Sequence, residues 1–168
     1  LNLLAVAHNY EQKGERVRVL RPRIDVRYGP DAVTSRVGLS RVADLLLDAD
    51  TVLAPEDFRG VACLLVDEAQ FLSPELVDQL RRLTWEPGVP VICYGLRTDF
   101  RTRAFPGSLR LLEVADAIEE VKTVCHFCHH KAIFNLRFSA EGVVREGPQI
   151  ELGAEDRYRP VCGACYHE

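Results

Sequence analysis

An acidic pair that follows an apolar run is the first candidate for chemistry. Residues 61–66 are apolar on both faces, as is typical of a buried parallel strand, and Asp67 and Glu68 follow directly. The carboxyl ends of such strands are where open α/β sheets bind ligands. In phosphoryl-transferring folds an acid at this position holds the magnesium shell, and the next acid can act as a base. The alternative is an ordinary helix-capping or surface role for the pair.

Two pairs of cysteines are the second candidate. Cys125 and Cys128, and then Cys162 and Cys165, are each separated by two residues, a spacing that lets both sulfurs of a knuckle face one ion. We therefore predict a zinc ion held by four thiolates, with a long loop between the pairs pinned at its base. A redox dithiol or chance spacing is the alternative. Four nearby histidines could replace a cysteine as ligands, although solvated loop positions are the favoured interpretation: His126, His129, His130 and His167.

A third, weaker candidate is Asp25 with Arg27 at the end of another expected strand, from which both could reach the cleft of the acidic pair. Without other motifs, a solvated pair in a turn would be the favoured interpretation. The remaining cysteines, Cys63 and Cys93, lie inside apolar strands and are interpreted as core residues.

Alternating helices and strands are expected to position these residues. Ser73 followed by Pro74 predicts a helix start, and the next apolar residues form one stripe. The other expected elements are a helix from Leu1 to Lys13-Gly14, strands at 16–23, 61–66, 89–94 (buried) and 118–123, helices at 41–49 and 109–115, and an antiparallel strand at 132–138.

The chain divides by character near residue 120. We predict an α/β core over residues 1–120 and a small zinc-binding domain over 121–168. The first helix starts without a capping residue and the chain contains no Met, so we expect a strand and a loop to precede Leu1.

Composition narrows the functional class. A net charge of −4 does not suit a general nucleic-acid binder, which would carry a basic footprint. No apolar run is long enough to span a bilayer and no signal peptide is visible, so the cytoplasm is the expected compartment. Paired cysteines in a reducing compartment favour metal ligation over disulfides.

Taken in order, these motifs resemble the zinc-containing thymidine kinases of bacteria and animal cytosol, which are typically tetrameric. The resemblance spans nearly the whole chain and rests on residues 21–28, 67–71 and 94–101, both cysteine pairs, and residues 153–158. It implies a P-loop-type parallel sheet with helices on both faces, whose first strand and phosphate-binding loop would end just before Leu1. It also implies a small zinc-binding lasso domain that closes over the nucleoside.

The resemblance implies a role for each matching residue. Glu68 would be the general base that takes the proton of the nucleoside 5′-hydroxyl, and Asp67, Asp25 and Arg27 would organise magnesium and the phosphates. The apolar walls around thymine would be Phe71, Leu96, Phe100 and Phe105. The lasso would supply the backbone of Gln149, Ile150, Glu151, Leu152, Gly153 and Ala154, together with Tyr158. Ala154 departs from the family, which often has a second glycine there. From the residues alone, Phe71 and Leu96 would be interpreted as core, and Tyr158 as an ordinary loop aromatic.

The implied ligands are ATP as phosphate donor, thymidine and deoxyuridine as acceptors, magnesium, a structural zinc ion and thymidine triphosphate as a feedback inhibitor. The resemblance also implies a homotetramer that binds neither nucleic acid nor a membrane. Two other functional classes share some of these motifs. A zinc-bearing helicase-like ATPase shares the Asp-Glu-Ala-Gln string but needs a second motor domain. A non-catalytic nucleotide-binding or zinc module would require that no phosphate-binding loop precedes Leu1.

Overall fold

The computed structural model describes residues 2–23, 32–34, 40–149 and 157–168. These residues form two compact units, each of which is described by itself. The first unit comprises Leu1–Leu96 and Pro106–Val114, and the second comprises Arg97–Phe105 and Ala115–Glu168. Residues 97–105 therefore pack with the C-terminal part of the chain.

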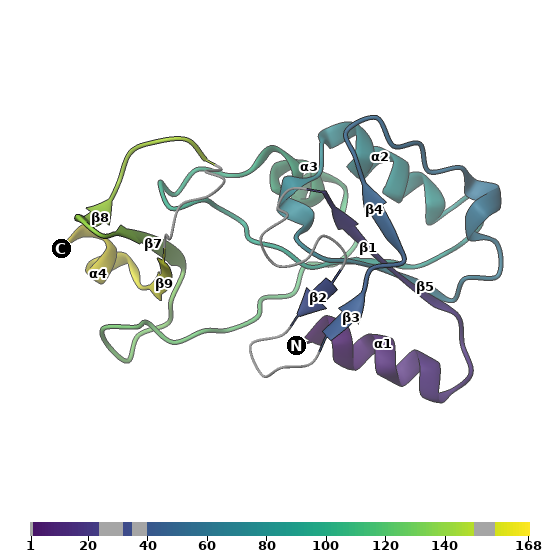
Figure 1. Ribbon diagram of the computed structural model, residues 1–168, viewed down its shortest axis with the longest axis horizontal. Helices are drawn as coiled ribbons and strands as arrows, with labels where there is room; N and C mark the ends of the chain where they lie inside the picture. The colour runs from purple at the N-terminus through teal and green to yellow at the C-terminus, as the bar shows by residue number, and fades with distance from the viewer. Residues whose placement is uncertain (1, 24–31, 35–39, 150–156) are drawn as a thin grey trace. The chain divides into compact units, whose positions relative to one another are not determined.

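A parallel four-stranded sheet organises the first unit (Figure 1). Its order is β4 (Leu45–Leu47), β1 (Val17–Pro22), β5 (Cys63–Val66) and β6 (Val91–Cys93). All three pairings are parallel, and β5 lies between β1 and β6. Every residue of β5 is buried, which confirms the interpretation of its apolar run.

Helices cover both faces of this sheet, because alternate residues of the strands point to opposite sides. Helix α1 (Asn2–Gln12) packs through Leu3 and Ala7 on a face formed by residues such as Val19 and Leu65. Helix α2 (Pro74–Leu83) packs on the opposite face, which includes Leu64. The expected α/β class with a parallel sheet and helices on both faces is confirmed.

The start of α2 has the predicted cap. Ser73 Oγ accepts a hydrogen bond from the backbone N–H of Leu76 at 3.2 Å, and Pro74 occupies the first turn. The buried stripe is the expected one and consists of Leu76, Val77, Leu80 and Leu83. Helix α3 (Pro106–Val114) begins three residues before the expected start, and the short 3-10 helices are η1 (Pro55–Phe58) and η2 (Ala69–Phe71).

Three local predictions were wrong. Residues 41–49 contain no helix; the end of β3 (Ser40–Val42) and strand β4 lie there, and β3 pairs antiparallel with β2 (Ala32–Thr34). The leucines of β4 satisfy a helical spacing equally well, but pairing with β1 decides for a strand. No strand forms at 118–123, where Ile118 is 66% and Val121 68% exposed. Strand β6 is present, but it lies at an edge of the described sheet. It is therefore not the buried strand that was expected, and its residue Ile92 is 38% exposed.

An antiparallel three-stranded sheet organises the second unit. Strand β7 (Phe134–Ser139), predicted from its alternation, lies between β8 (Gly142–Val144) and β9 (Arg157–Val161), and helix α4 (Gly163–His167) follows β9. A small core joins the cysteine pairs to Leu136, Val161 and Tyr166. None of the helices within the described ranges has the length and apolarity required to cross a membrane.

Candidate active site and metal centre

The acidic pair lies at the carboxyl end of β5, an inner strand of the sheet that pairs with β1 and β6. The backbone N–H of Asp67 donates to the carbonyl oxygen of Leu20 on β1 at 2.9 Å. On the other side, the N–H of Ala69 donates to the carbonyl oxygen of Tyr94, which follows β6, at 2.9 Å. The turn that carries both carboxylates is therefore fixed from two neighbouring strands.

Glu68 has an unusual backbone conformation. Its φ of 51° and ψ of 37° place a residue with a full side chain in the left-handed region, which costs about 1–2 kcal/mol. Such strain persists only where the surroundings enforce it, and it is concentrated at functional sites. Here the left-handed conformation turns the chain from β5 directly into η2, so that Asp67 and Glu68 lie at the carboxyl end of β5.

Burial makes both acids more basic than exposed carboxylates. It raises the pKa of Asp67, an effect that the nearby Arg21 guanidinium on β1 partly offsets. It also raises the pKa of Glu68, where a hydrogen bond from Gln70 opposes the rise, Asp67 adds to it and Arg21 counteracts it. A carboxylate with a raised pKa is better matched to accepting a proton near neutral pH.

The other predicted site residues of the first unit differ in position. Phe71 ends η2, directly after the acidic turn. Leu96 is 46% exposed, so the interpretation of Leu96 as a core residue is wrong. The Ser108 hydroxyl donates to the Leu96 carbonyl oxygen at 2.6 Å, which fixes that backbone. Asp25 and Arg27 lie outside the described residues.

In the second unit, Phe100 and Phe105 are buried, with 2% and 5% exposure. The Arg137 guanidinium lies 5.0 Å from the centroid of the Phe100 ring, and the Tyr166 hydroxyl donates to the Phe100 carbonyl oxygen at 2.7 Å. Tyr158 lies on β9 and is 47% exposed.

Asp99 organises the turn that contains Phe100. Its buried carboxylate accepts from the backbone N–H groups of Arg101 and Arg103, both at 2.9 Å, and from the Arg101 guanidinium. It also accepts from the side-chain amide of Gln149 at 3.1 Å. Burial by itself would raise the pKa of Asp99, but these hydrogen bonds lower it overall. The predicted lasso residue Gln149 is thereby tied to residues 99–103, whereas Ile150, Glu151, Leu152, Gly153 and Ala154 lie outside the described residues.

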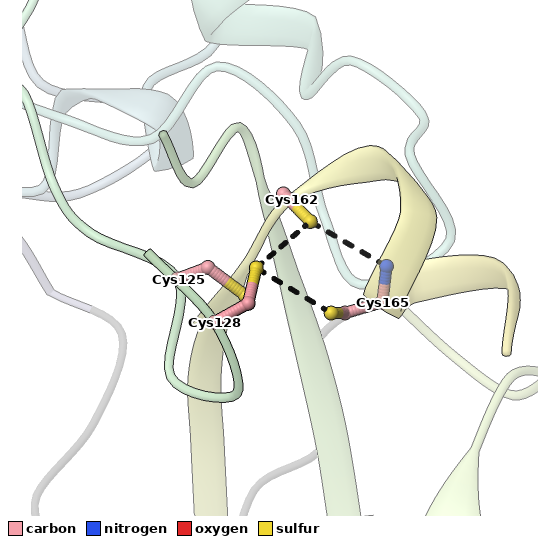
Figure 2. Close-up of side chains that lie close together, drawn as sticks. All are labelled: Cys125, Cys128, Cys162 and Cys165. Carbon is pink, nitrogen blue, oxygen red and sulfur yellow. Dashed lines mark hydrogen bonds between the residues drawn. The ribbon is translucent and has the colours of Figure 1, made fainter. Parts of the chain in front are cut away.

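All four paired cysteines converge on one point, as Figure 2 shows. Their Sγ atoms lie within 4.8 Å of one another. The Sγ of Cys128 lies 3.6 Å from that of Cys162 and 3.7 Å from that of Cys165. Backbone bonds hold the first knuckle, since Cys125 N–H donates to the His130 carbonyl oxygen at 2.9 Å.

This geometry fits a zinc ion. Four sulfurs at the usual zinc–sulfur distance of about 2.3 Å, arranged as a tetrahedron, lie about 3.8 Å apart. The observed separations match that value and are far longer than a disulfide bond. Although burial favours the neutral thiol, hydrogen bonds from surrounding backbone groups lower the pKa of Cys125 to about 6, whereas burial and the neighbouring thiols raise the pKa of Cys165 to about 12. A bound metal would favour the thiolate form of all four cysteines. Of the histidines considered as substitute ligands, His130 places Nδ1 3.4 Å from the Cys128 sulfur and is therefore a neighbour of the cluster.

The thymidine kinase family model matches residues 1–166. The chain belongs to the thymidine kinase family. A thymidine kinase of Chromobacterium violaceum is 48% identical, covering 98% of this chain and 89% of that protein. Thymidine kinases of Lactobacillus johnsonii and Xanthomonas campestris pv. campestris (strain 8004) are 41% and 45% identical, each covering 96% of this chain and 86% and 80% of those proteins, respectively.

Membership in the thymidine kinase family confirms the resemblance drawn from the motifs. Sequence reasoning nevertheless missed two polar residues at the candidate sites. Gln70 is 1% exposed, and the sequence assigned it no role of its own within the motif at residues 67–71. Asp99 is 3% exposed, and the signal that could have revealed it was the Thr-Asp-Phe-Arg string, because Asp favours turns in which its carboxylate accepts backbone N–H groups.

Proposed function

We propose that this protein is a thymidine kinase that transfers the γ-phosphate of ATP to the 5′-hydroxyl of thymidine, and of deoxyuridine, in nucleotide salvage. The observation that carries the proposal is the acidic turn after β5, in a chain of the thymidine kinase family. Its two half-buried carboxylates lie at the ligand-binding edge of a parallel sheet, and the pKa of Glu68 is raised.

Glu68 is the proposed general base. As the 5′-hydroxyl oxygen attacks the γ-phosphorus, the hydroxyl proton passes to the Glu68 carboxylate, and the bond from the γ-phosphorus to the leaving oxygen of ADP breaks. Because the turn is fixed by hydrogen bonds to both neighbouring strands, little reorganisation is needed for this transfer.

Asp67 is the proposed magnesium residue. It supplies carboxylate oxygens, the ligand type that magnesium prefers. The resemblance adds Asp25 and Arg27 as residues that organise the metal and the phosphates. Bound magnesium would neutralise the charge that develops on the phosphate oxygens. The Arg21 guanidinium, which already acts on Asp67, adds a fixed positive charge at the same edge.

The remaining proposed roles follow the resemblance. Residues 1–120 would carry phosphoryl transfer, and residues 121–168 would enclose thymine with the lasso and Tyr158. Phe71, Leu96, Phe100 and Phe105 would contact the base. The cysteine cluster would hold a structural zinc ion. We also propose a cytoplasmic homotetramer with feedback inhibition by thymidine triphosphate, for which the family resemblance is the support.

The test uses the full-length protein, including any residues that precede Leu1, with thymidine, ATP and magnesium. Glu68→Gln removes the base without changing side-chain volume. We expect kcat to fall by at least about 100-fold while KM for thymidine changes little, because the lost function acts in the transition state. Glu75→Gln, an exposed carboxylate in the first turn of α2, is the matched control and should retain activity. An unchanged kcat in Glu68→Gln would remove Glu68 from the base role.

A further inference from the structure

Gln70 is a buried polar side chain for which the proposed reaction gives no role. It belongs to η2 and is 1% exposed. A buried amide must satisfy both its N–H donors and its carbonyl oxygen, so its partners show what its orientation achieves.

The two ends of the Gln70 amide bond to different parts of the candidate site. Its Nε2 donates to Glu68 Oε2 at 2.6 Å, and its Oε1 accepts from the backbone N–H of Leu96 at 3.1 Å. A backbone N–H can only donate, so the amide oxygen must face Leu96 and the NH2 group must face Glu68. The environment therefore fixes which way the amide points.

This arrangement constrains the carboxylate. One oxygen of Glu68, Oε2, accepts a hydrogen bond from Gln70, which leaves Oε1 able to accept a proton. The donor also stabilises the ionised form of Glu68 against burial and the neighbouring Asp67 charge, in the same direction as Arg21 on β1.

Gly95 is required for this contact. A Cβ atom at position 95 would lie 2.6 Å from Gln70 Oε1 and 3.0 Å from the Gln70 backbone nitrogen. Both distances are below ordinary van der Waals contact, so a side chain at 95 would displace the amide from Leu96. The glycine is needed here for space, since its φ lies outside the left-handed region.

We propose that Gln70 is a positioning residue that orients the Glu68 carboxylate and couples it to the backbone of Leu96. The proposal rests on the proposed function, in which Glu68 takes the proton and Leu96 contacts thymine. A single side chain then sets the base and one wall of the nucleoside site relative to each other.

Two substitutions separate the two bonds. Gln70→Glu keeps an oxygen for the Leu96 N–H but replaces the donor to Glu68 with a second carboxylate. Gln70→Met keeps the volume and removes both bonds. Gln79→Glu is the matched control, because the Gln79 amide also bridges two backbone groups, the Leu53 N–H at 2.7 Å and the Thr51 carbonyl oxygen at 3.2 Å.

The first measurement does not depend on activity. Hydrogen exchange at the Leu96 backbone amide in the full-length protein should be faster in Gln70→Met than in the wild type, because this N–H loses its acceptor, and unchanged in Gln79→Glu. An unchanged exchange rate at Leu96 in folded Gln70→Met would overturn the proposal, whether or not the protein phosphorylates thymidine.

The second measurement is the steady-state kinetics of thymidine phosphorylation at neutral pH. In Gln70→Glu we expect kcat to fall by about tenfold or more with KM for thymidine nearly unchanged, because Glu68 loses its donor while the Leu96 N–H keeps an acceptor. Gln70→Met should in addition raise KM, because Leu96 loses its anchor. A wild-type protein that does not phosphorylate thymidine would contradict the proposed function itself. A wild-type kcat in Gln70→Glu, or an equal loss of kcat in Gln79→Glu, would overturn the positioning role of Gln70.

Discussion

The close packing of α3 on η2 leads to a sharp prediction for Gly107→Ala. A Cβ atom at Gly107 would lie 2.5 Å from the carbonyl oxygen of Leu72 and 2.9 Å from those of Ala69 and Gln70. All three obstacles are backbone atoms, so no side-chain rotation relieves the clash. The only response is a shift of η2 relative to the start of α3.

The size of the effect follows from these distances. To restore ordinary contact, the Leu72 carbonyl must retreat by roughly 0.5–1 Å, and over-packing of this kind costs about 1–3 kcal/mol. Alanine recovers up to about 1 kcal/mol of helix propensity. We expect a net loss near 1–2 kcal/mol in the free energy of unfolding, which lowers Tm by about 2–8 °C for a chain of this size.

The consequence for activity is larger than that for stability. Since η2 begins directly after Glu68, a shift of this turn displaces the proposed base, and misplacement by about 1 Å can lower a rate by about 100-fold. We therefore expect kcat for thymidine phosphorylation to fall by at least about tenfold in Gly107→Ala at a temperature where the protein is folded.

The assay compares thermal unfolding and steady-state kinetics for the wild type, Gly107→Ala and Leu109→Ala. Leu109 lies in the same helix and is 52% exposed, so its truncation should change Tm and kcat little. A Gly107→Ala protein with wild-type Tm and wild-type kcat would refute the reasoning, because three backbone contacts would then have been accommodated at no cost.

The remaining predictions concern the metal centre and pH. Cys162→Ser should abolish the binding of one zinc ion per chain, measured by elemental analysis, whereas Cys93→Ser should retain it; full zinc content in Cys162→Ser would contradict the ligand set. Burial raises the pKa of Glu68 in the folded protein, so the stability linked to it is present below the unfolded pKa and is lost as pH rises through the folded pKa. The free energy of unfolding of Glu68→Gln minus that of the wild type, measured by urea unfolding, should therefore be more positive at pH 8 than at pH 4. An equal difference at both pH values would count against a raised pKa.

Local patterns in the sequence predicted several elements well. The apolar run before Asp67 became the fully buried β5, and the Ser73-Pro74 start with its apolar stripe became α2. The cysteine spacing predicted a cluster that the fold assembles. In each case the information lies within a few neighbouring residues, where periodicity, capping or knuckle geometry dictates one arrangement.

Patterns that fit two structures were decided by partners distant in sequence. The leucines at 45–47 suit a helix or a strand, and the register of Leu45 opposite Leu20 on β1 selects the strand. The apolar residues Ile118 and Val121 suit a strand, yet residues 118–123 form none, because a strand needs a neighbour to bond its backbone groups.

The sequence by itself determined which acids end a buried strand and which thiols form a cluster, because both follow from short spacings. Only the tertiary structure decided how Glu68 is oriented. Its hydrogen bond to Gln70 depends on Leu96, and on the absence of side chains at Gly95 and Gly107. These residues meet only after β6 and α3 have packed beside the acidic turn, and close packing across such separations leaves no periodic signal in the chain.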